Sequence, residues 1–168
     1  MTLSMGISFM NKNNFMEKAN MRLLSILSIL ISLGYSNLAV AQDCSQTVES
    51  NDAMQFDLKE MRVSADCKNL TVTLKHVGNL PQQFMGHNWV LSTTADMMPL
   101  TGASMQAGAP SYLPEGDSRI IAATDMIGGG QETYVTFDMR SLDPSGDYTY
   151  FCTFPGHYAI MKGKFIIE

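Results

Sequence analysis

The chain has 168 residues, of which 11 are Lys or Arg and 16 are Asp or Glu, and hydrophobic residues make up 45% of it. This length and composition predict a globular protein with room for one domain and a single buried core. The formal net charge of −5 argues against nucleic-acid binding, because that function needs a basic surface to neutralise phosphates.

The N-terminal region carries the pattern of an export signal. A positive charge at Met21-Arg22 precedes an apolar run over 23–33, and Ala39-Val40-Ala41 places small residues where a signal peptidase cleaves. We expect cleavage after Ala41, with Met21 as the true start; the alternative is a long n-region that includes residues 1–20. The apolar run is short for a membrane span, so we expect no membrane insertion of the mature chain. Residues 42–168 then form one domain, with eight cationic and fifteen anionic residues and a net charge of −7.

The three cysteines fit an oxidising compartment. Cys44 and Cys67 lie near the start of the mature chain, 23 positions apart, and are expected to pair there. Cys152 is left over. An unpaired thiol in such a compartment indicates intermolecular pairing, a nucleophile or a metal ligand.

Turn signals are frequent after residue 42, and short runs between them favour strands. Leu70–Leu74 alternates apolar and polar residues as a half-buried strand does. Other runs rich in β-branched and aromatic residues predict further strands: these are Phe56–Val63, Asn88–Ser92, Ser118–Ala122, Thr133–Asp138, Asp147–Thr153 and Gly163–Glu168. Many short strands of this kind predict an antiparallel all-β fold, a Greek-key sandwich or barrel of about eight strands.

One interval breaks the strand pattern. Residues 93–113 are rich in Ala, Met and Gly and show no alternation. We expect an insertion there that carries a short helix, near Ala95–Met98 or Thr101–Ala107.

The loop after the strand at 147–153 concentrates metal-binding side chains. It contains Cys152, His157 and Met161 with the spacing Cys-x4-His-x3-Met, and a distant Gly86-His87-Asn88 supplies a second imidazole. Two imidazoles, a thiolate and a weak axial thioether form a ligand set that suits copper. In a sandwich, the strand ends that carry these residues can meet at one pole.

Each residue also has a simpler interpretation. Cys152 can be a buried free thiol, His87 a hydrogen-bonded core histidine, and Met161 ordinary packing among 14 methionines. His76 has no partner by spacing and is interpreted as structural. Zinc rarely uses a thioether, and a Cys-His hydrolase would leave His87 and Met161 unexplained. An immunoglobulin-like module would place its disulfide around the single Trp, whereas both candidate cysteines precede Trp89.

The chain resembles the azurins, small periplasmic proteins of the cupredoxin (type 1 blue-copper) family. The likeness covers residues 42–168, and the segments that carry it are Asp43-Cys44-Ser45, Asn51-Asp52, Met54-Gln55-Phe56, Cys67, His76–Pro81, Met85–Thr93, Asp117-Ser118-Arg119 and Phe151–Gly163. The departures lie mainly in 97–113 and at Val77 and Ala123, and they leave the candidate ligands intact.

The resemblance implies a role for each residue of the site. His87, Cys152 and His157 would be the strong ligands of one copper ion, Met161 the long axial ligand, and the Gly86 carbonyl a weak opposite contact. Asn88, Phe154 and Pro155 would surround these ligands, and Cys44 would pair with Cys67.

The function implied is a one-electron carrier in the periplasm, not an enzyme. An apolar patch around His157 would dock redox partners, for which c-type cytochromes and periplasmic reductases or dehydrogenases are the expected classes. Besides Phe154 and Pro155, its expected members are Met54, Leu80, Pro81, Met85, Met105 and Ile160. Copper storage is the alternative. A copper oxidase is disfavoured because it would need further copper clusters, and the chain's three histidines are too few to hold them.

Overall fold

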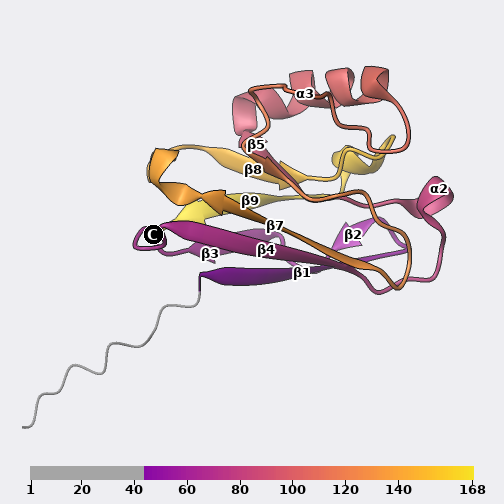
Figure 1. Ribbon diagram of the computed structural model, residues 1–168, viewed down its shortest axis with the longest axis horizontal. Coiled ribbons are helices and arrows are strands. Elements are labelled where there is room, and N and C mark those ends of the chain that lie inside the picture. The colour runs from indigo at the N-terminus through magenta and orange to yellow at the C-terminus, as the bar shows by residue number, and fades with distance from the viewer. Residues whose placement is uncertain (1–43) are drawn as a thin grey trace, which may run out of the picture. The chain divides into compact units, whose positions relative to one another are not determined.

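A computed structural model describes residues 44–168, and the expected signal peptide and its cleavage point lie outside them. The described chain contains two sheets, two α-helices and two short 3-10 helices (Figure 1). One sheet has the strand order β2-β1-β4-β7 and the other the order β3-β9-β8-β5-β6. The elements are β1 (Ser45–Asn51), β2 (Gln55–Phe56), β3 (Glu60–Val63), β4 (Asn69–His76), α2 (Gln82–Met85), β5 (Val90–Thr93), α3 (Thr94–Ala107), β6 (Ala122–Ala123), β7 (Glu132–Asp138), η1 (Met139–Ser141), β8 (Tyr148–Phe151), η2 (His157–Ala159) and β9 (Lys162–Ile167).

The predicted two-sheet all-β fold is confirmed, and its strands obey the alternation expected from the sequence. In β4, Leu70, Val72 and Leu74 are buried while the residues between them are partly exposed. They belong to one core cluster with Tyr150 and Phe165 of the facing sheet and with Trp89, which directly precedes β5. Alternation places every second side chain on the core face, so burial of this set fixes the register of the strand.

The strand pairing differs from the antiparallel expectation in two places. β1 runs parallel to β4, and β3 runs parallel to β9. β1 itself was not predicted, because Ser45–Asn51 is mostly polar and only Val48 and Ser50 are fully buried. The strand expected over Phe56–Val63 is interrupted, since β2 ends at Phe56 and β3 begins at Glu60.

The prediction of a strand over Ser118–Ala122 is wrong for most of its length. Ser118 and Arg119 lie in a turn, in which the Asp117 carboxylate accepts a hydrogen bond from the Arg119 backbone N–H at 3.0 Å. Such a side-chain contact offers the backbone an alternative to sheet pairing. Only Ala122–Ala123 remains as a strand, paired with β5.

The insertion predicted at 93–113 carries one continuous helix rather than a short one. α3 begins after Thr93, whose hydroxyl accepts a hydrogen bond from the Asp96 N–H, and it ends at Gly108, which has a φ of 71°. It runs through Pro99 and buries Met97 and Leu100 against Val90 and Phe151 of the five-stranded sheet. Figure 1 shows α3 lying over β5 and β8, on the side away from the four-stranded sheet. Packing of this face explains why the helix persists through a proline.

The disulfide expected between Cys44 and Cys67 is present, with a Cα–Cα distance of 5.6 Å. It ties the residue that precedes β1 to the turn that precedes β4. Cys152 is the free cysteine of the described chain, and it is buried.

Candidate metal centre

Neighbouring strands bring the two halves of the candidate site together. β5 and β8 are antiparallel with Val90 opposite Phe151, so the start of β5 lies beside the end of β8. His87 is three residues before Val90, and Cys152 directly follows Phe151. His157 begins η2 on the loop that leads into β9. The pole expected from the sequence therefore exists at this end of the five-stranded sheet.

Three donor atoms converge at this pole. The Cys152 Sγ lies 4.0 Å from the His87 Nδ1 and 3.7 Å from the His157 Nδ1, and the two Nδ1 atoms are 3.2 Å apart. All three residues are buried. Ligands about 2.0–2.3 Å from one ion stand apart by separations of this order. Among residues 44–168, these are the only three His, Cys, Asp or Glu side chains grouped closely enough to hold a metal.

Hydrogen bonding prepares the His87 ring for a cation. Its Nε2 donates to the Asn51 carbonyl at 2.9 Å, which leaves Nδ1 as the unprotonated nitrogen facing the other two donors. Burial lowers the pKa of His87 to about 4, an effect that the contact with Asn51 partly offsets. Burial also lowers the pKa of His157 to about 4. Both imidazoles are therefore neutral at pH 7 and offer lone pairs to a metal.

Burial has the opposite effect on the pKa of the Cys152 thiol. Burial raises the pKa of Cys152 to about 12, although the backbone amides of Asn88 and Phe154 favour its thiolate by hydrogen bonding. The metal-free thiol thus keeps its proton at pH 7, and a metal must displace that proton to bind the sulfur. Two neutral imidazoles and one thiol that loses its proton to a metal match the His₂Cys donor set of blue-copper sites, so the residues present fit copper.

The loops that carry these ligands are bonded to each other. Asn88 exchanges two hydrogen bonds with Thr153, the residue after Cys152. His87 forms an isolated antiparallel bridge with Ile127. The Cys152 N–H donates to the Met161 carbonyl at 3.1 Å, and the Met161 N–H donates to the His157 carbonyl at 2.8 Å. The donors are therefore held by backbone and buried side-chain contacts.

The two remaining candidate ligands lie close to this group. Met161 is fully buried in the core cluster, and its backbone contacts both Cys152 and His157. The Gly86 carbonyl oxygen lies 3.9 Å from the Cys152 Sγ. A Cβ at position 86 would come within 2.7 Å of the Gln82 carbonyl and 3.1 Å of the Phe154 ring, so a side chain has no room there.

A third histidine packs against the site without joining it. His76 is buried and stacks on His87 with a ring-centroid distance of 4.4 Å. Its Nε2 lies 2.9 Å from the Met85 carbonyl, and its Nδ1 accepts from the Gly78 N–H at 3.0 Å. The sequence did not predict the stacking of His76 on His87, because the two residues come from different elements, β4 and the segment before β5.

The expected docking residues are all exposed or half-buried. Leu80, Met105 and Ile160 expose 41%, 48% and 54% of their surface. Pro81 is also exposed, whereas Met54, Met85, Phe154 and Pro155 are half-buried. Sequence reasoning missed Phe84, which is 74% exposed on α2. The sequence could have indicated Phe84, because it is an apolar residue directly before Met85, which is an expected member of the patch.

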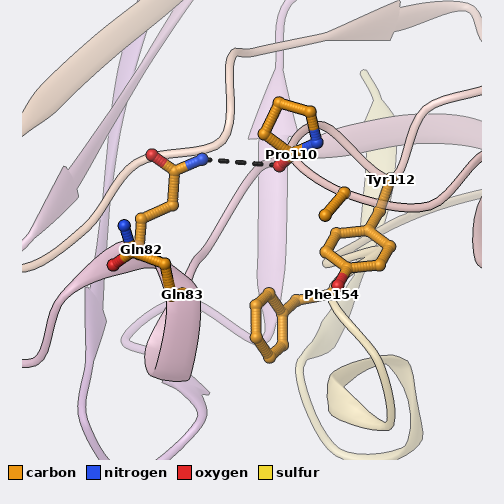
Figure 2. A pocket seen from close by; sticks show the side chains of 6 residues that line it. Gln82, Gln83, Pro110, Tyr112 and Phe154 are labelled. Atoms are coloured by element: carbon orange, nitrogen blue, oxygen red, sulfur yellow. Dashed lines mark hydrogen bonds between the residues drawn. The ribbon is translucent and has the colours of Figure 1, made fainter.

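A cleft of about 240 Å³ opens beside Phe154 (Figure 2). Gln82 and Gln83 of α2 form one wall, and Ala109, Pro110 and Tyr112 of the loop after α3 form another. The Tyr112 ring meets Phe154 edge-on at 5.4 Å, and Phe154 packs on His157 at 4.6 Å between ring centroids. Phe154 therefore lies between the cleft and the His157 ring.

Comparison with known proteins places this site in a family. The model of copper-binding proteins of the plastocyanin/azurin family matches residues 42–168. Azurin from Achromobacter denitrificans is 50% identical over 143 residues, which cover 84% of this chain and 96% of that protein. Azurin from Pseudomonas fluorescens biotype C is 53% identical over 127 residues, 75% of this chain and 99% of the relative.

A solved structure agrees with the sequence relatives. The azurin Az-iso2 from the obligate methylotroph Methylomonas sp. strain J superposes with a TM-score of 0.72 at 40% identity, covering 75% of this chain and 98% of that one. A family of copper-binding proteins, together with one buried His-Cys-His group, identifies copper as the cofactor. This chain belongs to the plastocyanin/azurin family of copper-binding proteins.

Proposed function

We propose that this protein is a one-electron carrier whose copper is held by His87, Cys152 and His157. Met161 would be a further, weaker ligand, and the Gly86 carbonyl would be a weak contact. The observation that carries the proposal is the convergence of one thiol sulfur and two imidazole Nδ1 atoms within 4.8 Å of one another in a buried site. When bound, copper supplies a one-electron couple between its two oxidation states.

The surrounding chain suits a carrier because it fixes the donors. The Asn51 carbonyl orients His87, the Asn88–Thr153 pair joins the two ligand loops, and the His157 carbonyl holds the Met161 backbone. A site held in this way changes little between two redox states. Burial of all three donors also leaves no exposed position for a substrate, which supports a carrier rather than an enzyme.

His157 is the exit that we propose for the electron. Its ring packs against the half-buried Phe154, with 4.6 Å between the ring centroids. Leu80, Met105 and Ile160 expose apolar surface, and the other proposed members of the patch are Met54, Pro81, Met85, Phe154 and Pro155. Redox encounters use small interfaces that release quickly, and an exposed apolar patch favours such docking. The proposed partner classes are c-type cytochromes and periplasmic reductases or dehydrogenases.

We further propose that the mature protein works in the periplasm as a single domain of residues 42–168. The Cys44–Cys67 disulfide supports an oxidising compartment. No helix in the described part of the chain is long and apolar enough to cross a membrane. N-terminal sequencing of the exported protein is expected to begin at Gln42, and a start upstream of that residue would contradict this assignment.

The function is tested by optical titration followed by redox cycling. Addition of copper(II) to the purified protein should produce an intense visible absorption, typical of a copper-thiolate bond. Repeated reduction and reoxidation should then bleach and restore the colour while the metal stays bound. Ready exchange of the metal with a chelator during cycling would instead indicate a copper buffer.

A further inference from the structure

A second hollow lies between α3 and the start of β9, away from the cleft beside Phe154. Its volume is about 290 Å³, and Lys59, Lys162 and Lys164 line it together with Thr94, Thr149 and Met97. Lys162 and Lys164 are exposed residues of β9 and flank the buried Gly163. Met97 is almost fully buried and belongs to the apolar contact between α3 and the sheet. We call this feature the lysine hollow.

Its charge stands out because the domain is acidic. Of the eight cationic side chains in residues 44–168, five form ion pairs within the described chain. Lys59 and Lys162 have no such partner among the described residues, and both line the lysine hollow. The third cation without a partner, Lys68, lies elsewhere, in the turn before β4. Two uncompensated positive charges are therefore concentrated at one place on a protein of net negative charge.

The polar groups between the lysines are already engaged. Lys164 donates to the Asp147 carboxylate at 2.5 Å, and the Thr94 hydroxyl donates to the same oxygen at 2.9 Å. The Thr94 and Thr149 hydroxyl oxygens are 2.8 Å apart. A small anion needs fixed donors that converge on it, whereas these hydroxyls are engaged and the free ammonium groups sit on long exposed side chains. The hollow is better suited to several carboxylates spread over a surface.

The lysine hollow begins close to the copper ligands. Lys162 directly follows Met161 and lies opposite Phe151, the residue before Cys152. Ile160, an exposed member of the proposed apolar patch, precedes Lys162 by two residues. One partner can therefore contact the apolar patch and the lysine hollow together.

We propose that the lysine hollow docks an acidic face of a protein redox partner and orients it relative to the apolar patch around His157. Charge complementarity carries this inference: unpaired positive charges in an acidic domain attract carboxylates, and such pairs fix register and speed association. The proposal rests on the electron-carrier function and adds the chemistry of the partner, an apolar contact flanked by Asp and Glu side chains.

The test measures binding rather than electron transfer. A hexaglutamate peptide with blocked ends is titrated into the mature protein loaded with copper(I), and amide shifts are followed by ¹H–¹⁵N NMR at low ionic strength. Shifts are expected at Thr94, Thr149, Gly163 and Lys164, and they should weaken as salt is added, because surface charges are screened. The double variant Lys59→Gln/Lys162→Gln should bind the peptide roughly tenfold more weakly, since each exposed ion pair contributes up to about fivefold.

The matched control removes the same charge elsewhere. Lys68→Gln/Lys75→Gln lowers the net charge equally, in β4 and the turn before it, and should keep the wild-type affinity. An equal loss in both double variants would overturn the proposal, because attraction would then depend on net charge alone. Free glutamate at the same carboxylate concentration is expected to give no comparable shifts; if it reproduces them, the hollow is a small-anion site and the docking proposal is wrong. Failure of peptide binding in a protein that still cycles its copper would leave the carrier function intact.

Discussion

Asn88 and Thr153 exchange two buried hydrogen bonds across the copper site. The Asn88 Nδ2 donates to the Thr153 Oγ1 at 2.8 Å, and the Thr153 backbone N–H donates to the Asn88 Oδ1 at 2.9 Å. Because Asn88 follows His87 and Thr153 follows Cys152, this pair joins two proposed ligands that are 65 residues apart in the chain. The two loops are thus joined by direct protein contacts.

Asn88→Ala is expected to destabilise the copper-free protein by about 2–4 kcal/mol, because it leaves a buried N–H and a hydroxyl without partners. Urea unfolding measures this loss, and the rate of copper transfer to a chelator should rise in parallel. Thr153→Val is the matched control. It removes one of the two bonds and keeps the N–H contact, so its cost should be smaller, about 1–2 kcal/mol. Equal stability of Asn88→Ala and wild type would show that the pair does not hold the loops.

Cys152→Ser tests the thiolate ligand. The mutant should lose the intense visible absorption of bound copper(II), because a hydroxyl cannot supply the sulfur-to-copper charge transfer. Its far-ultraviolet circular dichroism should match wild type, since serine occupies the same buried position with one atom changed. A folded mutant that remains intensely blue would rule out Cys152 as the ligand.

Met161→Leu tests the weak axial ligand. A Leu-for-Met exchange nearly conserves volume, so the fold should lose less than about 1.5 kcal/mol. The blue colour should persist, because it depends on Cys152, while the reduction potential measured by voltammetry shifts upward as an electron donor to copper(II) is lost. Loss of bound copper in this mutant would count against an axial role and favour a ligand that the site needs for affinity.

The parts of the site that the sequence predicted are the local ones. Cys152, His157 and Met161 lie within one loop, so their spacing alone indicated a shared ion, and the strand alternation over Leu70–Leu74 indicated which face is buried. That His87 belongs with them rested on its flanking residues and on a family resemblance. No pattern near His87 encodes the pairing of Val90 with Phe151 that brings it to Cys152.

The features that the sequence did not predict depend on tertiary contacts. The parallel partner of β1 is β4, and a mostly polar strand such as Ser45–Asn51 carries little alternation to identify it. The turn at Ser118–Arg119 forms because the Asp117 side chain binds the backbone. α3 continues through Pro99 because Met97 and Leu100 are buried against the sheet. Lys59 and Lys162 likewise share a hollow although they are about a hundred residues apart.

The two buried imidazoles predict an acid-sensitive copper-free protein. Burial lowers the pKa values of His87 and His157 to about 4 in the folded state, below the ordinary value of about 6.5. Between these values the unfolded chain binds more protons, so the stability of the folded protein falls as pH decreases from 6.5 toward 4. The free energy of unfolding in urea should be lower at pH 4.5 than at pH 7.5, by on the order of 5 kcal/mol for the two residues together. His157→Gln should reduce this pH dependence by about half, and an unchanged pH dependence in that mutant would contradict the assignment.

Leu80→Asp tests the apolar patch as the route of electron exchange. Leu80 is 41% exposed, and its backbone N–H contacts the Asp52 carboxylate, so the side chain can change without opening the core. A carboxylate placed in an apolar contact must lose its water on docking, which should slow electron exchange with a c-type cytochrome by about tenfold. Stopped-flow mixing measures the rate, and the visible spectrum should stay unchanged because no ligand is altered. Tyr134→Asp provides the matched control, since Tyr134 is 71% exposed on β7 of the four-stranded sheet and is not a member of the proposed patch. If both mutants slow exchange equally, the effect is one of net charge, and if neither does, the electron leaves by a route other than the patch around His157.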